Sequence, residues 1–302
     1  MWDFSIGGAL GMMARTMPFI VLRMAVYFGI AVGYVLVTGT GAGIGYGIGG
    51  FGDEGFQASS TLWGGHIAVL VELIDGKPMP DERSQVSYAT EVVKERFAQA
   101  SVLFAIDQLI KGVVAAITGL VRGILSFLPL PGIRQISGIL HAFLRVAVGF
   151  IDEVILAHAI RTRSTNPWAS AKEALVLYGQ NYKVMLKNAA WLATIVYLMS
   201  FLVFLVMLAP AALVVYLMPG AWAAGGLVFA LLFAWSVKAA LLEPFAIACL
   251  MQVYFRTIEN QKPDPEWEAR LEQMSAKFRK LKAKALDNAG AATPEGSDLQ
   301  KA

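Results

Sequence analysis

The chain has 302 residues, of which 57% are hydrophobic and 16% are charged, and its formal net charge is +3. Soluble domains carry about a quarter charged residues, so this composition predicts a membrane protein whose main partner is the lipid bilayer. The small net charge, with no Lys/Arg stripe interleaved with aromatic residues, argues against nucleic-acid binding. The single cysteine, Cys249, rules out an internal disulfide framework.

Six segments are candidate membrane spans, because a helix needs about twenty apolar residues to cross a bilayer. In chain order they are 17–38, 57–74, 101–126, 134–158, 189–217 and 221–254. The first and the last two are clear, the second is just long enough, and the third and fourth carry several charges. The N-terminal residues lack the basic start of a signal peptide, so we expect 17–38 to be the first anchor. We predict an all-α, polytopic fold with six spans, or four if 101–158 forms an amphipathic pair at the membrane surface.

Glycines recur after the first span, from Gly39 to Gly52. In a helix they would form two ridges of small residues that let membrane helices approach closely, including helices of a second copy. In a loop they would make a connection near Asp53 that could line an entrance. Gly45, Gly47 and Gly50 match the dinucleotide fingerprint formally, but that motif needs a preceding parallel strand, so we interpret the match as accidental.

The third and fourth candidate spans each place polar residues on one side of a helix. These residues include Asp107 and Lys111 in the third span, and Arg145 and Asp152 in the fourth. A charge exposed to lipid at the centre of a membrane costs about 2.5 to 3.5 kcal/mol, so the two stripes should face each other or a water-filled cavity. Folding the pair about its Pro-rich turn predicts an ion pair between Lys111 and Asp152. The alternative is an interfacial pair of helices whose charges are solvated.

Lys and Arg in the connections predict the orientation in the membrane. The connection 161–188 has five basic residues and one acid, whereas 24–76 and 188–237 contain no Lys or Arg. We therefore expect both termini and the connections 75–99 and 161–188 to face the cytoplasm. In a prokaryote this membrane would be the inner cell membrane.

The last candidate span contains two charges, Lys238 and Glu243. Together they would cost about 5 to 7 kcal/mol if isolated at the membrane centre, so partners are expected. Residues five apart do not face each other on a straight helix, but Pro244 directly follows Glu243 and should kink the helix.

Two interpretations of these charges stay open. In the first the pairing is structural, and the expected partners are Asp152 for Lys238, and Arg145 or Lys111 for Glu243. In the second the charges form a binding or proton-coupling site, with Glu243 as the anionic group and Trp235 or Trp191 as an aromatic wall.

The C-terminal region predicts cytoplasmic helices. Asn166-Pro167 and Asp264-Pro265 are typical of helix starts. Apolar residues then recur at spacings of four and three through 265–284, which predicts one amphipathic helix. That helix would dock on the protein's own cytoplasmic face or on lipid, or would associate with a second copy. The resulting division is a membrane domain over 1–260, a cytoplasmic helix over 261–286 and a disordered tail over 287–302.

Motifs for catalysis and metal binding are missing. His66, His141 and His158 form no HExxH or paired ExxH arrangement, and the sequence has neither a Walker loop nor a GxSxG elbow. We expect no enzyme activity, no cofactor and no metal. His66 follows Trp63-Gly64-Gly65, and we expect a buried, hydrogen-bonded histidine there rather than a pH sensor.

The segment Ala157–Lys187 resembles the late cytoplasmic segment of the choline transporter-like family, with a Ser-Ala-Lys step at 170–172. The end of the last span, FAIACLMQVYFRTIEN, is similar to the final helix of that family. The resemblance covers about residues 95–262, and the family's long N-terminal half and large extracellular loop have no counterpart in this sequence. It implies transport of choline-like cations, which an aromatic cage of Trp235 beside the carboxylate of Glu243 would suit.

Two functions follow as expectations. The first is a transporter or channel-like permease for a small solute, a choline-like cation or a lipid head group. The second is a membrane scaffold that binds partner proteins without catalysis.

Overall fold

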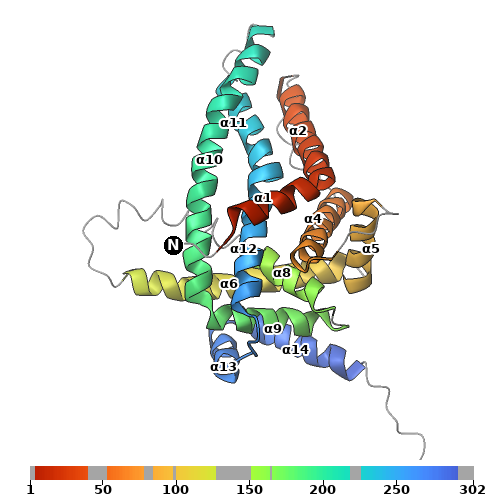
Figure 1. Ribbon diagram of the computed structural model, residues 1–302, viewed down its shortest axis with the longest axis vertical. Helices are drawn as coiled ribbons and strands as arrows, with labels where there is room; N and C mark the ends of the chain where they lie inside the picture. The colour runs from red at the N-terminus through yellow and green to blue at the C-terminus, as the bar shows by residue number, and fades with distance from the viewer. Residues whose placement is uncertain are drawn as a thin grey trace, which may run out of the picture.

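The computed structural model describes residues 4–39, 53–77, 84–97, 100–126, 151–163, 165–217 and 226–291. Within these ranges all regular elements are helices (Figure 1). The all-α fold predicted from the sequence is therefore confirmed for the described residues. The glycine run after Gly39 and the tail after Ala291 lie outside them.

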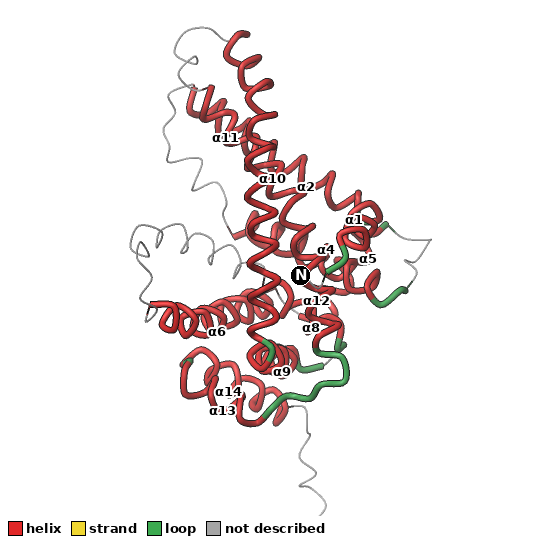
Figure 2. The backbone as a smooth tube through the Cα atoms, turned by 60° about the vertical axis from the view of Figure 1, so that its left-hand side comes forward, coloured by secondary structure: helices red, strands yellow, loops and turns green. Residues whose placement is uncertain are grey.

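Three helices form one end of the molecule, which we call the membrane layer: α2 (Met17–Gly39), α10 (Tyr182–Leu217) and α11 (Gly226–Val237). Helix α11 packs on both of the others (Figures 1 and 2). Two helical stretches, Tyr182–Leu213 and Gly226–Thr257, are long and apolar enough to cross a membrane, and a bent pair that contains α2 gives a third. These helices support a membrane protein, whereas the count of six spans stays a prediction.

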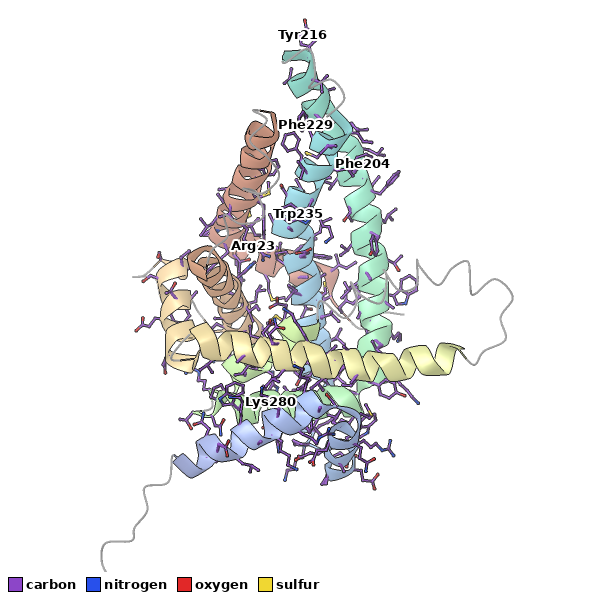
Figure 3. All side chains as sticks on the ribbon, turned by 180° about the vertical axis from the view of Figure 1, so that it is seen from behind. Arg23, Phe204, Tyr216, Phe229, Trp235 and Lys280 are labelled. Carbon is purple, nitrogen blue, oxygen red and sulfur yellow. The ribbon has the colours of Figure 1, made fainter. Side chains whose placement is uncertain are left out.

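The membrane layer also carries nearly all of the large apolar side chains that are exposed. Among the residues that the structure describes, all of them except Leu286 lie on α1 (Ile6–Arg15), on α2, on α10 or on the stretch that begins with α11. Exposing such side chains to water costs about 25 cal/mol per Å² of apolar surface, whereas lipid removes that cost. Tyr216, at the tip of α10, is 82% exposed, while Phe229 is buried where α10 and α11 meet (Figure 3).

The last span is one continuous helical rod. It consists of α11, a π-helical turn η2 (Lys238–Leu242) and α12 (Glu243–Thr257). At 1.5 Å per residue, its 32 residues extend about 48 Å, which exceeds the roughly 30 Å of a hydrocarbon core. Ten of the 15 residues of α12 are buried, so this end of the rod continues into the rest of the protein.

Below the membrane layer lies the largest hydrophobic core. It includes buried residues from α4 (Asp53–Ile74), α8 (Ile151–Arg161), α9 (Pro167–Gln180) and α12. In α4, residues 67–71 are all 1% exposed or less. The predicted second span therefore ends in a protein core rather than in lipid. Helix α5 (Gln85–Phe97) packs against α4 at the side of this body (Figure 1).

Helix α6 (Ala100–Ser126) corresponds to the third candidate span, but it runs across the molecule. It crosses the direction of α10 at a steep angle in all three whole-molecule views (Figures 1, 2 and 3). It packs against α14 (Ala276–Ala291), where a Cβ atom on Gly112 would lie 2.7 Å from Cγ of Lys277. This arrangement favours the surface-lying alternative for this segment. Residues 127–150, most of the fourth candidate span, lie outside the described part of the chain.

The single helix predicted over 265–284 is wrong, because the chain breaks at Ser275. There α13 (Pro265–Met274) ends and α14 begins, and Ser275 has extended backbone angles of φ −135° and ψ 112°. The Ser275 hydroxyl accepts a hydrogen bond from the Phe278 N–H, which caps α14. The break lets the two helices fold together instead of continuing as one rod.

The folded pair α13–α14 covers its own apolar face. Leu271, Phe278 and Leu281 are 0% exposed, and the pair packs on α9 and α6. Lys282 of α14 forms ion pairs with Glu268 and Glu272 of α13. The predicted amphipathic face is thus docked on the same chain, and association with a second copy through it stays a prediction.

Both predicted helix starts are confirmed. The side chain of Asn166 accepts a hydrogen bond from the Ala169 N–H at 3.1 Å, and that of Asp264 accepts one from the Glu266 N–H at 2.8 Å. In each case proline occupies the first helical position, where its missing N–H costs nothing. The start of α9 is also tied to α14, because the Asn166 amide donates to the carbonyl oxygen of Ala285.

Candidate functional site

Lys238 and Glu243 form an ion pair where the last span changes from α-helix to π-helix. Nζ of Lys238 lies 2.6 Å from Oε1 of Glu243, and the two side chains are 25% and 23% exposed. The Glu243 N–H donates to the carbonyl oxygen of Lys238, five residues earlier. This wider turn brings residues five apart onto one face, which a straight α-helix does not do.

The sequence gives a physical reason for the wide turn. Pro244 has no N–H to donate to the preceding turn, and its ring crowds that turn, so the α-helical ladder is interrupted next to Glu243. The pairings predicted from the sequence joined these charges to Asp152, Arg145 or Lys111. The structure joins Lys238 and Glu243 to each other, because the π-helical turn changes which residues face each other, and the predicted pairings with Asp152 and Arg145 stay predictions.

The other predicted site residues lie on different elements. Asp107 and Lys111 of α6 pair with each other at 2.8 Å, and their side chains are 32% and 52% exposed. They are four residues apart on an accessible helix face, so we interpret them as a solvated surface pair. Arg145 and the side chain of Asp152 lie outside the described residues, and so does any contact that Asp152 makes with Lys111.

A third charge, Arg23, is buried near this ion pair and is not among the site residues predicted from the sequence. Arg23 lies on α2, which packs against η2, and is 1% exposed. The carboxylates of Glu243 and Glu153 are close enough to attract it electrostatically. A charged residue inside a candidate span is a functional signal in itself, and that signal was present in the sequence.

Arg23 contacts His66 of α4. Its Nη1 lies 3.2 Å from Nδ1 of His66, and both side chains are 1% exposed. A guanidinium can only donate, so Nδ1 accepts and the ring proton sits on Nε2. Among the described residues Nε2 has no hydrogen-bond partner. His66 also stacks on Phe19, with ring centroids 5.3 Å apart and an interplanar angle of 3°.

Aromatic and hydroxyl side chains join α2 to α11 next to these charges. The Tyr27 and Trp235 rings meet edge to face at 5.3 Å between centroids, and the Ser236 hydroxyl lies 3.2 Å from the carbonyl oxygen of Tyr27. Trp235, which Figure 3 shows on α11, is 45% exposed, so it does not close this cluster off from its surroundings. Trp191 of α10 is 44% exposed. We call Arg23, His66, Lys238 and Glu243, with Tyr27 and Trp235, the polar layer.

A second charged network lies at the C-terminal end of α4, six to nine residues after His66. Arg163 pairs with Glu72 at 3.0 Å, Arg161 pairs with Asp75 at 2.7 Å, and Lys77 contacts both carboxylates. The hydrogen bond to Glu72 raises the pKa of Arg163. Arg161 and Arg163, two of the basic residues in the connection 161–188, thus hold the start of that connection at the end of α4 through ion pairs.

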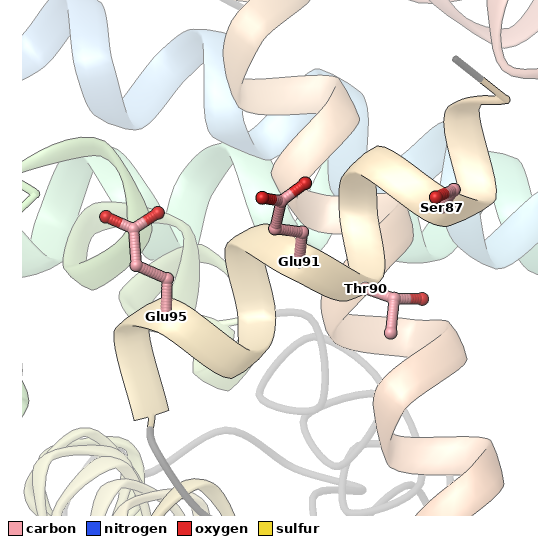
Figure 4. A pocket seen from close by; sticks show the side chains of 4 residues that line it. All are labelled: Ser87, Thr90, Glu91 and Glu95. Atoms are coloured by element: carbon pink, nitrogen blue, oxygen red, sulfur yellow. The ribbon is translucent and has the colours of Figure 1, made fainter.

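An open hollow of about 730 Å³ lies on α5, at the side of the protein. Ser87, Thr90, Glu91 and Glu95 line it (Figure 4). Within the described ranges, no group of three or more His, Cys, Asp or Glu side chains could hold a metal ion.

Comparison of the chain with protein-family models, curated proteins and solved structures finds no match. The resemblance to the choline transporter-like family therefore stays a prediction.

Proposed function

We propose that the protein is a membrane transporter for a small polar solute and that the polar layer is its solute site. The observation that carries this proposal is the Lys238–Glu243 pair on a π-helical turn. Such turns occur often at functional sites, and each charge inside a membrane costs several kcal/mol unless it is paired. An apolar pair at the same positions would avoid this cost, so the presence of the charges favours a role in binding.

The proposed topology has four crossings. Helices α2, α10 and the rod from α11 to α12 supply three, and α1 and α13–α14 both lie toward the end of these helices opposite the tip of α10 (Figure 1). The even number follows from the expectation that both termini face the cytoplasm. In this topology α6 lies along the membrane surface on the cytoplasmic side.

The solute that fits best is one with both a cationic and an anionic group. Glu243 is already paired with Lys238, and Arg23 adds a second positive charge nearby. A simple cation such as choline must displace Lys238 and leave it without a counter-ion, whereas the anionic group of a zwitterion can pair with the displaced ammonium. Trp235 and Tyr27 could then cover the methylated ammonium group of a phosphocholine-like solute.

Flux into liposomes that contain the purified chain tests this function. We expect uptake of phosphocholine above that of protein-free liposomes. Glu243→Gln and Lys238→Met should each reduce the uptake by more than about tenfold, the effect of losing about 1.4 kcal/mol of interaction. Asp107→Asn, in the surface pair of α6, serves as the control and should leave uptake unchanged. Equal uptake by wild type and Glu243→Gln would remove the polar layer from the transport path.

The second candidate function is a membrane scaffold, and one observation favours it. Lys238 and Arg23 each have a protein partner within hydrogen-bonding distance, which a purely structural cluster also requires. Under this function the folded pair α13–α14 and the body below the membrane would hold partner proteins. No transport of any zwitterionic or cationic solute by folded protein in liposomes, together with stable capture of a defined membrane complex, would favour it over the transporter.

A further inference from the structure

Helix α1 lies across α2 rather than extending it. The two helices meet at Thr16 at an angle of 77°. The hydroxyl of Thr16 lies 3.0 Å from the carbonyl oxygen of Met12, so the side chain satisfies a backbone group at the corner. The bend therefore separates a helix that crosses the membrane layer from one that runs at an angle to it (Figure 1).

One face of α1 is fixed to α12. Ala9, Met12 and Met13 are buried, and α1 packs on α12. At the start of α1 the side chain of Ser5 caps the helix, and the Ser5 N–H lies 3.4 Å from Oε1 of Gln252. These contacts set both the position of α1 and the direction in which its other face points.

The other face of α1 is apolar and exposed. Ile6 is 40% exposed and Leu10 is 56% exposed, and the surface continues past the corner to Met17 and Val21, which are 49% and 59% exposed. The only charged side chain on α1 is Arg15, in its last turn. A monomeric soluble protein rarely leaves such a continuous apolar surface open to water.

We propose that α1 is an interfacial helix whose exposed face contacts lipid at the boundary between head groups and acyl chains. The occupant is lipid because this face continues past the corner, where Arg15 is the one charged residue of α1, into the exposed apolar residues of α2, a candidate span. The interaction is mainly apolar, since a single arginine gives little attraction to anionic head groups. Helix α1 therefore lies in the plane of the leaflet nearest α13–α14.

This placement also sets the depth of the ion pair. Helix α1 meets α12 near Gln252, nine residues after Glu243, which corresponds to about 13 Å along the rod. Glu243 therefore lies about that far from the level of α1, toward the tip of α10. The lipid contact of α1 does not depend on the proposed transport function.

Spin labels on the full chain in lipid vesicles test the proposal. The variants are Leu10→Cys and Ile6→Cys on the exposed face, and the parent chain, whose Cys249 is buried, is the labelling control. At both exposed positions we expect collisions with dissolved oxygen to exceed those with a water-soluble nickel complex by at least about threefold, as for a residue at the membrane interface. Salt at about 0.5 M screens surface charges. It should leave this ratio unchanged, because the proposed contact is mainly apolar.

Two results would overturn it. Greater access to the nickel complex than to oxygen at Leu10 and Ile6 would place this face in water. Dipolar broadening between labels at position 10 would show that a second copy covers this face. Gly7 and Gly11 have open space beside them and would allow such close contact between two helices.

Discussion

The Lys238–Glu243 pair permits a quantitative prediction from a double-mutant cycle. The single variants are Lys238→Met and Glu243→Gln, and the third variant carries both changes. Removing one partner of a buried ion pair costs about 3 to 5 kcal/mol, because the other charge stays buried without compensation. Since each side chain is about a quarter exposed, we expect each single change to lower the free energy of unfolding by about 2.5 kcal/mol.

The double variant should lose only about 1 kcal/mol, because it leaves no charge unpaired. The coupling energy, the double change minus the two single ones, is then about 4 kcal/mol in magnitude. The assay is reversible unfolding of the purified chain in lipid bicelles. The exposed pair Asp107–Lys111, four residues apart on α6, is the control, with an expected coupling of about 0.5 kcal/mol. A coupling energy below about 1 kcal/mol for Lys238 and Glu243 would refute the claim that they form a buried ion pair, because the two charges would then be separately solvated.

Two further predictions concern the docking of α13–α14. Gly112→Val should weaken the packing of α14 on α6 by about 1 to 3 kcal/mol, because the valine side chain would overlap Lys277. Lys277→Ala in the same chain should restore part of this loss. The rate of proteolysis between α12 and α13 measures both effects. Burial alone would raise the pKa of Glu268, but hydrogen bonds from Lys282 and Lys172 outweigh the burial and hold that pKa below the ordinary 4.5. Hydrogen bonds to Glu268 and Glu272 raise the pKa of Lys282 above 10.5. The Glu268 contribution is therefore present above pH 4.5 and lost as the pH falls, and the Lys282 contribution is present below pH 10.5 and lost as the pH rises. The protection factors of the α14 amides, which compare hydrogen exchange with that of an unfolded chain at the same pH, should therefore be highest between these limits. Unchanged protection factors at pH 3 would show that the ion pairs do not hold the helices together.

Local signals in the sequence predicted helix starts well. The caps at Asn166 and Asp264 depend only on residues within three positions, and the prolines that follow them fix the backbone independently of tertiary structure. The break at Ser275 was not predictable in this way, because the apolar spacing continues through it. Ion pairs between α13 and α14 and burial on α9 decide the break, and both are tertiary contacts.

The polar layer could be predicted only in part. Lys238 and Glu243 stand out in an apolar segment, but their mutual pairing depends on a π-helical turn that a period of 3.6 residues does not reveal. Arg23 was equally visible as a charge within the first span, whereas its contact with His66 joins residues 43 positions apart. The glycine run and Arg145 lie outside the described residues, so the predictions for them stay open.

The central claim is that the polar layer meets solute from water, and the reactivity of a cysteine at position 238 tests it most directly. In a Cys249→Ala background, Lys238→Cys is treated with a charged, membrane-impermeant thiol reagent, and Lys183→Cys, at the exposed start of α10, is the positive control. We expect Cys at position 238 to react in the folded protein, because the polar layer is open to water. Reaction only after unfolding, while the control reacts readily, would contradict the account, because the polar layer would then be a dry structural cluster.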